Sequence, residues 1–254
     1  MSFERLIHLV GNEGFAKLQK THVAVVGIGG VGSWASESLA RSGIGRLTLF
    51  DFDVVNPTNL NRQLTCLCDT VGRPKAQVMA ERLRKINPAA QIEAINEVFC
   101  PENAELLWQV SPDIILDCID NITYKCYLLA QALERSIPIV TSTGAGGRFD
   151  PTQIRVSDLN NTRVDPVALQ VRKKLRRDYG FTADRSFHIP AVYSEELPQK
   201  PYLTEDESAD TYSTSQTFIT GKGRHAPPCG TSSFVTGAFG LVAASQVVKA
   251  ILDR

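Results

Sequence analysis

Four short apolar runs in the first 143 residues predict the framework of the fold. They occupy residues 23–26, 47–50, 114–116 and 137–140, and they are rich in Val, Ile and Leu without a regular alternation of apolar and polar residues. Runs of this kind are typical of strands that are covered on both faces, as the strands of a parallel sheet are. We therefore expect these four runs to form buried strands.

A helical pattern lies between the second and the third of these runs. Its apolar residues recur at spacings of three and four: Ala76, Met79, Ala80, Leu83 and Ile86. This spacing predicts one buried helix face, and the helix is expected to stop at Asn87-Pro88. Strand and helix thus alternate from about residue 22 to residue 143. The alternation predicts an α/β fold with a doubly wound, Rossmann-like, mostly parallel sheet.

The rhythm changes after residue 150. We expect a strand at 153–157 and then a helix whose first turn is capped by the carboxylate of Asp165. Residues 195–226 are rich in Pro, Ser, Thr, Gly and acidic residues, which predicts a long mobile loop. A final apolar helix is expected from about 233 to 252.

Composition narrows the function mainly by exclusion. Apolar residues make up 43% of the 254 residues and charged residues 21%, which excludes a disordered chain. Lys plus Arg equals Asp plus Glu at 27 each, so the formal charge is zero. This balance argues against a broadly basic coat for nucleic acid, although it leaves room for a local basic patch.

The cysteines and the C-terminal apolar stretch bear on location. No two of the six cysteines form C-x-x-C: Cys66, Cys68, Cys100, Cys118, Cys126 and Cys229. We therefore expect neither zinc nor a disulfide framework, and a cytoplasmic location. The stretch from Ser232 to Leu252 is long enough to span a membrane, but it contains Gln246 and Lys249. A buried or interface helix without stable membrane insertion is expected, with membrane association as the lesser alternative.

A glycine-rich turn directly follows the first apolar run. Gly27, Gly29, Gly30 and Gly32 stand in the sequence Gly-Ile-Gly-Gly-Val-Gly. Glycines permit a tight turn and a close approach of N–H groups to phosphate oxygens, and the N-terminus of the following helix favours anions. Asp51 ends the second run, where its carboxylate can accept hydrogen bonds from a ribose. These two features alone favour an NAD-dependent oxidoreductase.

The next segment favours a triphosphate. The residues from Asp51 to Gln63 are unusually polar, and Lys75 follows them. Arg62 and Lys75 supply more positive charge than a dinucleotide requires. Asp120, just after the third run, can hold Mg²⁺ on the phosphates. The alternative is that these charges form only a surface ion-pair network.

At these residues the sequence resembles the E1-like superfamily of ATP-dependent adenylating enzymes, which activate a carboxylate as its acyl-adenylate. The matching motifs cover most of residues 22–143: Gly27–Gly32, Asp51-x-Asp53, Asn59-x-x-Arg62-Gln63, Gly72-x-x-Lys75 and Asp117-x-x-Asp120-Asn121. The resemblance implies an ATP site made of the four glycines together with Asp51, Asp53, Asn59, Arg62, Gln63, Lys75 and Asp120. Of these, Asp51 is implied to bind the ribose and Asp120 the magnesium ion.

The same resemblance implies catalytic roles and an assembly. Arg62, Lys75 and Asp120 are implied to serve the triphosphate during the reaction. An arginine near the N-terminus, here Arg5, is implied to reach into the ATP site of the partner subunit in a homodimer. Relatives that act in sulfur routes also suggest a sulfur-relay protein as a partner.

A narrower resemblance lies downstream. The segment from Thr143 to Ile154, the basic helix and Cys229-Gly230 are similar to the tRNA threonylcarbamoyladenosine dehydratase branch of the superfamily. With Val26–Trp34 included, the similarity runs almost end to end. It implies that ATP activates the carboxylate of the threonylcarbamoyl group on adenosine 37 of tRNA. The side chain then cyclises and releases AMP, so that the net reaction is loss of water.

Three further features remain open at the level of sequence. The glycine-rich residues 144–147 are expected either to bind a monovalent cation or to shape the substrate cleft. Cys229 is a candidate reactive thiol, with an incidental thiol as the alternative. The candidate tRNA contacts of the basic helix, which can equally form a solvated face, are Arg172, Lys173, Lys174, Arg176 and Arg177.

Other functions fit the sequence less well. An E1-like enzyme that activates a carrier protein C-terminus for sulfur transfer would typically carry paired C-x-x-C motifs, which this chain lacks. An NAD-dependent oxidoreductase gives no purpose to Arg62 or Lys75, and a non-catalytic nucleotide-binding scaffold would not need the full set of ATP-site residues. We expect one domain over residues 1–254, with a nucleotide-binding core at 22–143. Residues 144–254, including the loop at about 195–226, are expected to form a substrate-side extension packed on that core.

Overall fold

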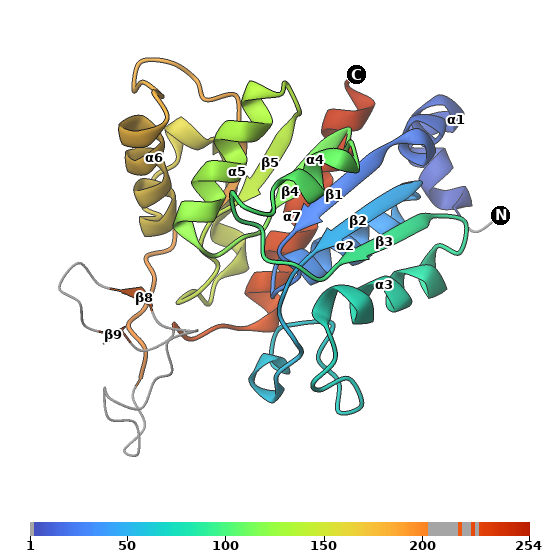
Figure 1. The fold of residues 1–254 in the computed structure, drawn as a ribbon, viewed down its shortest axis with the longest axis horizontal. Coiled ribbons are helices and arrows are strands. Elements are labelled where there is room, and N and C mark those ends of the chain that lie inside the picture. The colour runs from blue at the N-terminus through green and yellow to red at the C-terminus, as the bar shows by residue number, and fades with distance from the viewer. Residues whose placement is uncertain (1–2, 203–217, 220–224, 227–228) are drawn as a thin grey trace.

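A seven-stranded sheet forms the centre of the protein (Figure 1). The computed structural model describes residues 3–202, 218–219, 225–226 and 229–254. The strand order is β3-β2-β1-β4-β5-β7-β6, and neighbouring strands are parallel except β6, which is antiparallel to β7. The strands are β1 (His22–Val26), β2 (Arg46–Phe50), β3 (Gln91–Ile95), β4 (Ile114–Asp117), β5 (Ile139–Ser142), β6 (Ile154–Asp158) and β7 (Pro190–Ser194). The predicted fold class is confirmed.

Three of the four apolar runs form strands where the sequence predicts them, and the fourth is shifted. β5 begins at Ile139, two residues later than expected. The reason is that Ile137 still belongs to the end of the preceding helix, because its N–H donates to the Ala132 carbonyl at 2.8 Å. Pro138, which follows, has no N–H to contribute to a ladder.

Two strands carry no apolar run and were missed. β3 is an edge strand in which Gln91 and Glu93 are exposed and Ile92 is buried. An edge strand needs a covering on one face only, so its polar residues hide it from a search for continuous apolar runs. β7 begins with Pro190, a residue that normally argues against a central strand.

Helices cover both faces of the sheet. Along β1, Val23 and Val25 join one hydrophobic core, whereas Ala24 and Val26 join the other. The first core includes α1, α2, α3 and α7, and the second includes α4, α5 and α6. Figure 1 shows α6 at one end of the sheet and α3 towards the other. The helices are α1 (Glu4–Lys20), α2 (Gly32–Arg41), α3 (Lys75–Ile86), α4 (Glu105–Gln109), α5 (Ile122–Glu134), α6 (Pro166–Asp178) and α7 (Ser233–Leu252).

Helix α7 is apolar because it packs inside the protein. It is long and apolar enough to cross a membrane by length and composition, yet half of its apolar window is buried. Its glycines let it approach α2 closely, since a Cβ at Gly240 would lie 2.5 Å from the Val31 carbonyl oxygen. The ring of Trp34 lies against Gly237 in the same way. Core packing thus accounts for the buried half of this apolar stretch.

The predicted long loop is only partly described. Most of residues 195–226 lie outside the described residues, so the predicted mobility of that loop stays a prediction. Within the range, β8 (Phe218–Ile219) pairs with β9 (His225–Ala226), and the N–H of Gln199 donates to the Gly147 carbonyl at 2.6 Å. The start of this segment is therefore attached to the glycine-rich residues 144–147.

The edge of the sheet where parallel strands end is where chemistry is expected. β1 has β2 on one side and β4 on the other, so the chain turns in opposite directions after β1 and β4. Ligands of open α/β sheets bind at this switch point, beyond the carboxyl ends of the strands. Helices α2 and α5 begin directly after these two strands, and their N-termini add partial positive charge there.

His22, at the opposite end of β1, makes stability depend on pH. Its side chain is 5% exposed, its Nε2 lies 2.9 Å from the Thr48 hydroxyl, and burial together with Arg46 lowers its pKa. The unfolded chain therefore binds a proton at His22 more readily than the folded chain. We expect the free energy of unfolding to fall as the pH drops below about 6.5, and to fall less steeply in His22→Gln. Urea unfolding of both proteins between pH 5 and pH 8 tests this. If the free energy of unfolding changes equally with pH in the two proteins, His22 is not the cause.

Candidate active site

The glycine turn after β1 fits so tightly that two of its positions exclude any side chain. Gly27 has a φ of 94°, and a Cβ there would lie 2.7 Å from the Cys118 carbonyl oxygen. A Cβ at Gly32 would lie 1.8 Å from the Gly27 carbonyl oxygen. Gly29 differs, because the nearest atom to a Cβ there is Gln63 Nε2 at 3.9 Å. Its missing side chain keeps the backbone open to a ligand, as phosphate binding requires.

Asp51 ties this turn to the end of β2. Its carboxylate is 9% exposed and accepts the Ile28 N–H at 2.6 Å and the Asp53 N–H at 2.8 Å. Burial raises the pKa of Asp51, while Lys75 and the two N–H donors oppose that rise. The carboxylate thus fixes the glycine turn, and its lone pairs beyond these two bonds can accept ribose hydroxyls.

Lys75 stands at the start of α3 with its ammonium already in position. Its side chain is 6% exposed, and its Nζ donates to Asp53 Oδ2 at 2.7 Å. The Lys75 N–H also donates to the Asp53 carbonyl at 2.9 Å. Asp53, whose side chain is 47% exposed, therefore holds the lysine beside the carboxyl edge of the sheet.

The segment before Arg62 is shaped by Asn59. A short 3₁₀ helix covers Pro57–Asn59, and Asn59 Oδ1 accepts the Asn56 N–H at 3.1 Å. The Asn59 carbonyl accepts the N–H groups of Arg62 and Gln63 at 3.1 and 2.9 Å. Asn59 is 3% exposed, so its described contacts are those of a residue that positions the loop. Its predicted contact with ATP stays a prediction.

Arg62 and Gln63 face the glycine turn. The Arg62 guanidinium donates to the Thr58 carbonyl and to the Asn61 side chain, both at 3.0 Å. Burial lowers the pKa of Arg62 and the nearby Cys66 and Asp120 oppose this, but the group remains a cation. Gln63 is 7% exposed, and its Oε1 has no hydrogen-bond partner among the described residues. A buried acceptor without a partner beside an open glycine turn is consistent with a ligand that completes the site.

Trp34 is a residue that the motifs did not single out. Its indole N–H donates to the Arg62 carbonyl at 3.1 Å. The same ring packs against Gly237 of α7, and Thr236 of α7 lies against Gly30. Trp34 therefore connects α2, the Arg62 segment and the start of α7 around one edge of the site.

Asp120 follows β4 and is exposed, close enough to Arg62 for their charges to interact. A single carboxylate at this place fits Mg²⁺, which proteins usually bind through one or two carboxylates plus phosphate oxygens and water. Among the described residues no group of three His, Cys, Asp or Glu side chains could hold a metal by itself. Asp120 would thus hold Mg²⁺ together with the phosphates of ATP.

A buried ion pair lies beneath this edge and was not predicted from the sequence. Lys125 of α5 donates to Asp117 Oδ2 at 2.6 Å, and the two side chains are 1% and 0% exposed. Lys125 also donates to the Ser142 carbonyl at 2.9 Å, and Asp117 accepts the Thr141 hydroxyl at 2.6 Å. The pair joins the ends of β4 and β5. The motif marked Asp117, but no spacing signal distinguishes Lys125 from an exposed helix lysine.

The side chain of Arg148 lies against the backbone of the glycine-rich residues 144–147. Its guanidinium donates to Asp165 at 2.9 Å, and the two side chains are 2% and 0% exposed. It also donates to the carbonyls of Gly144 and Gly146. Those two oxygens therefore already face a cation belonging to the protein, while the predicted monovalent cation stays untested. Asp165 caps α6 as predicted, since its carboxylate accepts the Ala168 N–H at 2.9 Å.

Cys229 lies next to the same glycine-rich segment. A Cβ at Gly146 would lie 3.1 Å from the Cys229 Cβ, and the Gly147 N–H donates to the Gly230 carbonyl at 2.7 Å. The thiol is partly exposed. Its position near the site is clear from these contacts, and a chemical role for it stays a prediction.

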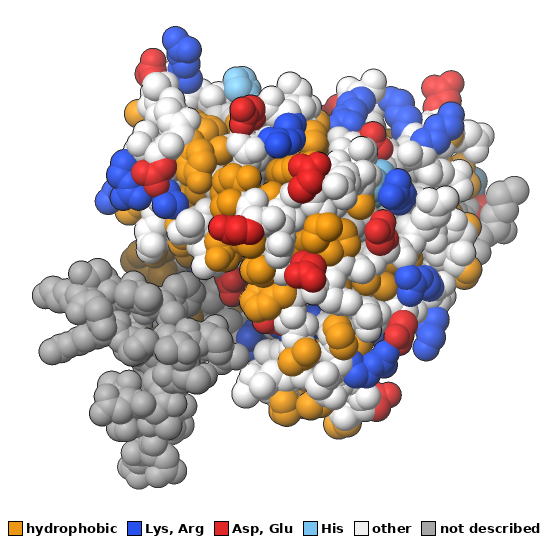
Figure 2. Space-filling view, viewed as in Figure 1, with side chains coloured by type: hydrophobic (Ala, Val, Ile, Leu, Met, Phe, Trp, Pro, Cys, Tyr) orange, Lys and Arg blue, Asp and Glu red, His pale blue; other side chains and the backbone are white. Residues whose placement is uncertain are grey.

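The basic residues of α6 are less free than the sequence suggests. Lys174 and Arg177 both pair with Asp178, at 2.9 and 2.6 Å. These contacts lower the pKa of the Asp178 carboxyl. Figure 2 shows blue side chains with a red one among them at the α6 end of the molecule.

The two arginines of the buried side of α6 bind a loop of their own chain. Arg172 donates to the Thr162 carbonyl at 2.8 Å, and Arg176 donates to the Asn160 side chain at 2.5 Å. Of the five predicted contacts, Lys173 and Arg177 are exposed and the other three are partly buried.

Arg5 is not brought to the other site residues. It lies exposed on α1, between Phe3 and Ile7, which line a hollow with Gly43, Gly45 and Gln91. These last residues precede or begin β2 and β3, so Arg5 lies at the amino edge of the sheet. It cannot serve the ATP site of its own chain from there.

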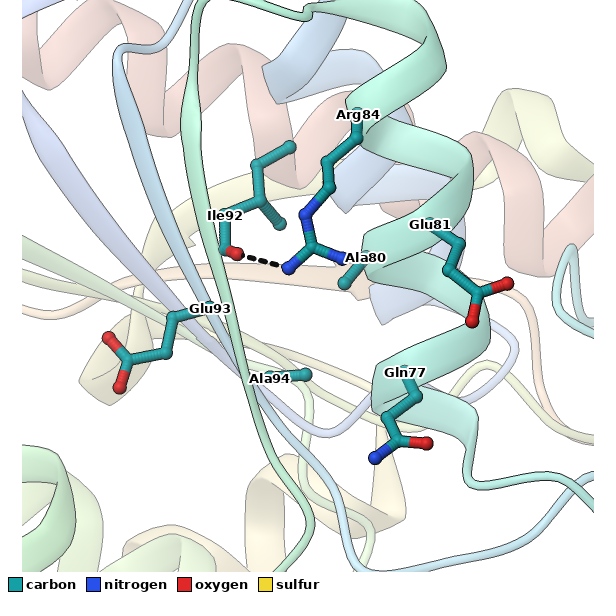
Figure 3. A pocket seen from close by; sticks show the side chains of 7 residues that line it. All are labelled: Gln77, Ala80, Glu81, Arg84, Ile92, Glu93 and Ala94. Carbon is teal, nitrogen blue, oxygen red and sulfur yellow. Dashed lines mark hydrogen bonds between the residues drawn. The ribbon is translucent and has the colours of Figure 1, made fainter.

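A second hollow lies outside the site. Figure 3 shows it between α3 and the edge strand β3, where Arg84 donates to the Ile92 carbonyl at 2.6 Å. None of its lining residues belongs to the motifs described above. The chemistry is therefore assigned to the carboxyl edge of β1, β2 and β4 and not to this hollow.

The geometry as a whole suits a nucleoside triphosphate. An open glycine turn, the N-termini of α2 and α5, and the cations Arg62 and Lys75 converge where a triphosphate would need neutralisation. The buried Asp51 provides the acceptor for a ribose. Neutralised in this way, the α-phosphorus becomes open to attack by a second anion such as a carboxylate.

Comparisons with known proteins agree with this interpretation. The ThiF family model matches residues 3–254. The chain is 40% identical over 244 residues to the tRNA threonylcarbamoyladenosine dehydratase of Haemophilus influenzae, which covers 95% of this chain and 90% of that protein. It superimposes on the crystal structure of the Escherichia coli tRNA N6-threonylcarbamoyladenosine dehydratase in complex with ATP with a TM-score of 0.86 and 37% identity. That superposition covers 99% of this chain and 93% of the other.

A weaker similarity reaches another adenylyltransferase. The molybdopterin-synthase adenylyltransferase of E. coli is 38% identical over 139 residues, which is 54% of this chain and 54% of that protein. This match covers little more than half the chain.

Proposed function

This chain belongs to the ThiF family, and from that premise we infer that it is an ATP-dependent tRNA threonylcarbamoyladenosine dehydratase. The observation that carries the inference is similarity over almost the whole chain, including residues 144–254, to an enzyme whose structure holds ATP. The molybdopterin-synthase adenylyltransferase matches only 54% of the chain, so adenylation of a carrier protein is not the preferred function. The family model, the relatives and the solved structure reported above give no support to an NAD-dependent oxidoreductase.

The reaction proceeds in two steps. The carboxylate of the threonylcarbamoyl group attacks the α-phosphorus of ATP, and pyrophosphate leaves, which gives an acyl-adenylate on the RNA. A nitrogen or oxygen atom of the threonylcarbamoyl group then attacks the activated carbonyl and loses its proton to solvent, and AMP leaves with one carboxylate oxygen. The product RNA is lighter by one water molecule.

The described residues supply the electrostatics of the first step. Two anions must meet, so Lys75 and Arg62 neutralise the triphosphate while the glycine turn donates backbone N–H groups. Asp51 orients the ribose. Mg²⁺ held with Asp120 would further stabilise the charge on the leaving pyrophosphate. In this proposal residues 22–143 act as the nucleotide core and residues 144–254 as the substrate side of one domain.

The direct test is ATP–pyrophosphate exchange with the modified tRNA as the acid substrate. We expect exchange that requires Mg²⁺ and tRNA carrying threonylcarbamoyladenosine. Unmodified tRNA should give none, because it offers no carboxylate. Equal exchange with both RNAs would contradict the assigned substrate.

The tRNA contacts of α6 are testable by salt dependence. We expect Lys173→Glu with Arg177→Glu to lower tRNA affinity and to flatten its dependence on salt, because these two cations are exposed on α6. The loss of tRNA affinity should be smaller than if all five cations were unpaired and exposed, since Arg177 forms an ion pair with Asp178. Lys20→Glu on the exposed side of α1 is the matched control. An unchanged slope in the α6 variant would exclude this helix from the interface.

We further propose a homodimer in which Arg5 acts on the partner's ATP site. Its place at the amino edge of its own sheet supports a role in trans. Arg5→Ala and Lys75→Ala should each be inactive alone, whereas an equal mixture, reassociated, should recover about a quarter of the activity. Half the dimers are then mixed, and each has one intact site. Failure of the mixture to recover, or a fully active Arg5→Ala, would contradict the proposal. The sulfur-relay partner stays a prediction.

A further inference from the structure

Two phenylalanine side chains form an exposed pair near the site that no step above uses. The rings of Phe149 and Phe234 stand edge to face, with centroids 5.1 Å apart and planes at 80°. Phe149 is 69% exposed and Phe234 is 47% exposed. An aromatic pair normally gains by burial, so a pair left this open offers apolar ring surface to a ligand.

The backbone that carries the pair is held firmly. The N–H groups of Phe149 and Asp150 donate to the Glu196 carboxylate at 2.9–3.0 Å. The preceding Arg148 is fixed by its buried ion pair with Asp165. Phe234 stands in the first turn of α7. The rings are thus displayed from a rigid support, which lowers the cost of ordering them on binding.

The pair adjoins the ATP site through the segment before α7. The Gly230 carbonyl accepts the Gly147 N–H at 2.7 Å, and the Thr231 carbonyl accepts the Asn61 side chain at 2.9 Å. Thr236, two residues after Phe234, lies against Gly30 of the glycine turn. One short segment therefore touches the triphosphate side and carries one of the two rings.

We propose that Phe149 and Phe234 form a stacking platform for the adenine base that carries the threonylcarbamoyl group: the base stacks on the face of one ring, and the other ring, edge to face with the first, holds it in place. The proposal rests on the proposed function and adds the subsite that holds the base. The carboxylate is attached to this base through a short chain, so the base must lie near the α-phosphate when the carboxylate attacks. A base inside the anticodon loop must leave its stack to reach an enzyme site, and aromatic rings replace the stacking that it loses.

The neighbouring charges fit a base more than a phosphate. The Glu196 carboxylate lies beside Phe149 and would repel a phosphate of the RNA backbone. Its oxygens accept the backbone N–H groups of Phe149 and Asp150. The cations Arg62 and Lys75 lie on the ATP side of the site. The aromatic pair thus offers an uncharged ring face beside the segment that contacts Gly30.

The test compares Phe149→Leu and Phe234→Leu with Phe149→Trp in the full-length protein. Loss of one stacking ring should weaken binding of the modified tRNA by about 5- to 150-fold, with the KM for ATP unchanged. Phe149→Trp keeps an aromatic ring, so it should bind the modified tRNA more tightly than Phe149→Leu, and the emission that it adds to that of the wild type should be quenched when the modified tRNA binds. Leu106→Ala, at an exposed apolar residue of α4 outside the site, is the control and should behave as wild type. Thermal unfolding of each variant controls for folding.

The outcomes separate the platform from the proposed function. Wild-type protein that does not dehydrate the tRNA contradicts the function itself. Active wild type, with both leucine variants binding the tRNA normally, overturns the platform alone. So does a blue-shifted added emission in the Phe149→Trp variant that the tRNA does not quench, because the ring is then covered by another part of the chain or by a second copy.

Discussion

Replacing Lys125 with methionine is expected to lower the free energy of unfolding by about 3–5 kcal/mol, the largest effect on stability that we predict. The substitution removes the cation that pairs with Asp117 inside the protein, where the two side chains are 1% and 0% exposed. The remaining carboxylate keeps the Thr141 hydroxyl and the Ile119 N–H as donors, but it loses its counter-charge. A buried unpaired charge is among the most costly features that a single substitution can leave behind.

Urea unfolding of matched variants tests this prediction. Lys85→Met, an exposed lysine of α3, should change the free energy by no more than about 0.5 kcal/mol. The double variant Asp117→Asn with Lys125→Met should regain part of the lost stability, because neither partner is then charged. If Lys125→Met is no worse than Lys85→Met, the buried pair does not hold the ends of β4 and β5.

Replacing Lys75 or Arg62 with alanine is expected to slow adenylation by about 10²–10³-fold, the typical cost of removing a positioned electrostatic group. Lys75 is held by Asp53, and Arg62 by the Thr58 carbonyl and the Asn61 side chain, so the protein's own contacts position both cations. Without either charge, the carboxylate and the triphosphate repel each other more strongly in the transition state.

The measurement is ATP–pyrophosphate exchange with the modified tRNA. Asp53, the hydrogen-bond partner of Lys75, is half-exposed, but Lys75 also offsets the charge of the buried Asp51, so thermal unfolding of each variant accompanies the exchange measurement. Lys17→Ala, on α1, is the control for loss of a lysine outside the site. Exchange at the wild-type rate in a folded Lys75→Ala or Arg62→Ala protein would rule out the assigned role.

The sequence predicts the structure best at positions where only one type of residue fits. Gly27 and Gly32 were predicted at a tight turn, and the close approaches to Cys118 and to Gly27 itself show why no other residue fits. The apolar runs predicted the central strands because those strands are covered on both faces. The edge strand β3 escaped because a strand in that position keeps Gln91 and Glu93 exposed.

The contacts made by long polar side chains were beyond prediction from the sequence. Lys125 and Arg148 look like ordinary surface residues along the chain, and only the fold shows that they are buried against Asp117 and Asp165. In α6 the basic residues look like an exposed binding surface along the chain, but Arg172 and Arg176 bind a loop of their own chain. A run of charges does not reveal which of them point outward. The indole bond from Trp34 to the Arg62 carbonyl likewise depends on two segments meeting in space.

Removal of water from threonylcarbamoyladenosine in tRNA, driven by ATP, is testable by mass spectrometry of nucleosides. The protein is incubated with ATP, Mg²⁺ and tRNA with or without the modification. We expect the modified adenosine to lose the mass of one water only when ATP is present, with one AMP formed for each product. An unchanged modified nucleoside in the presence of active, folded protein and ATP would contradict it.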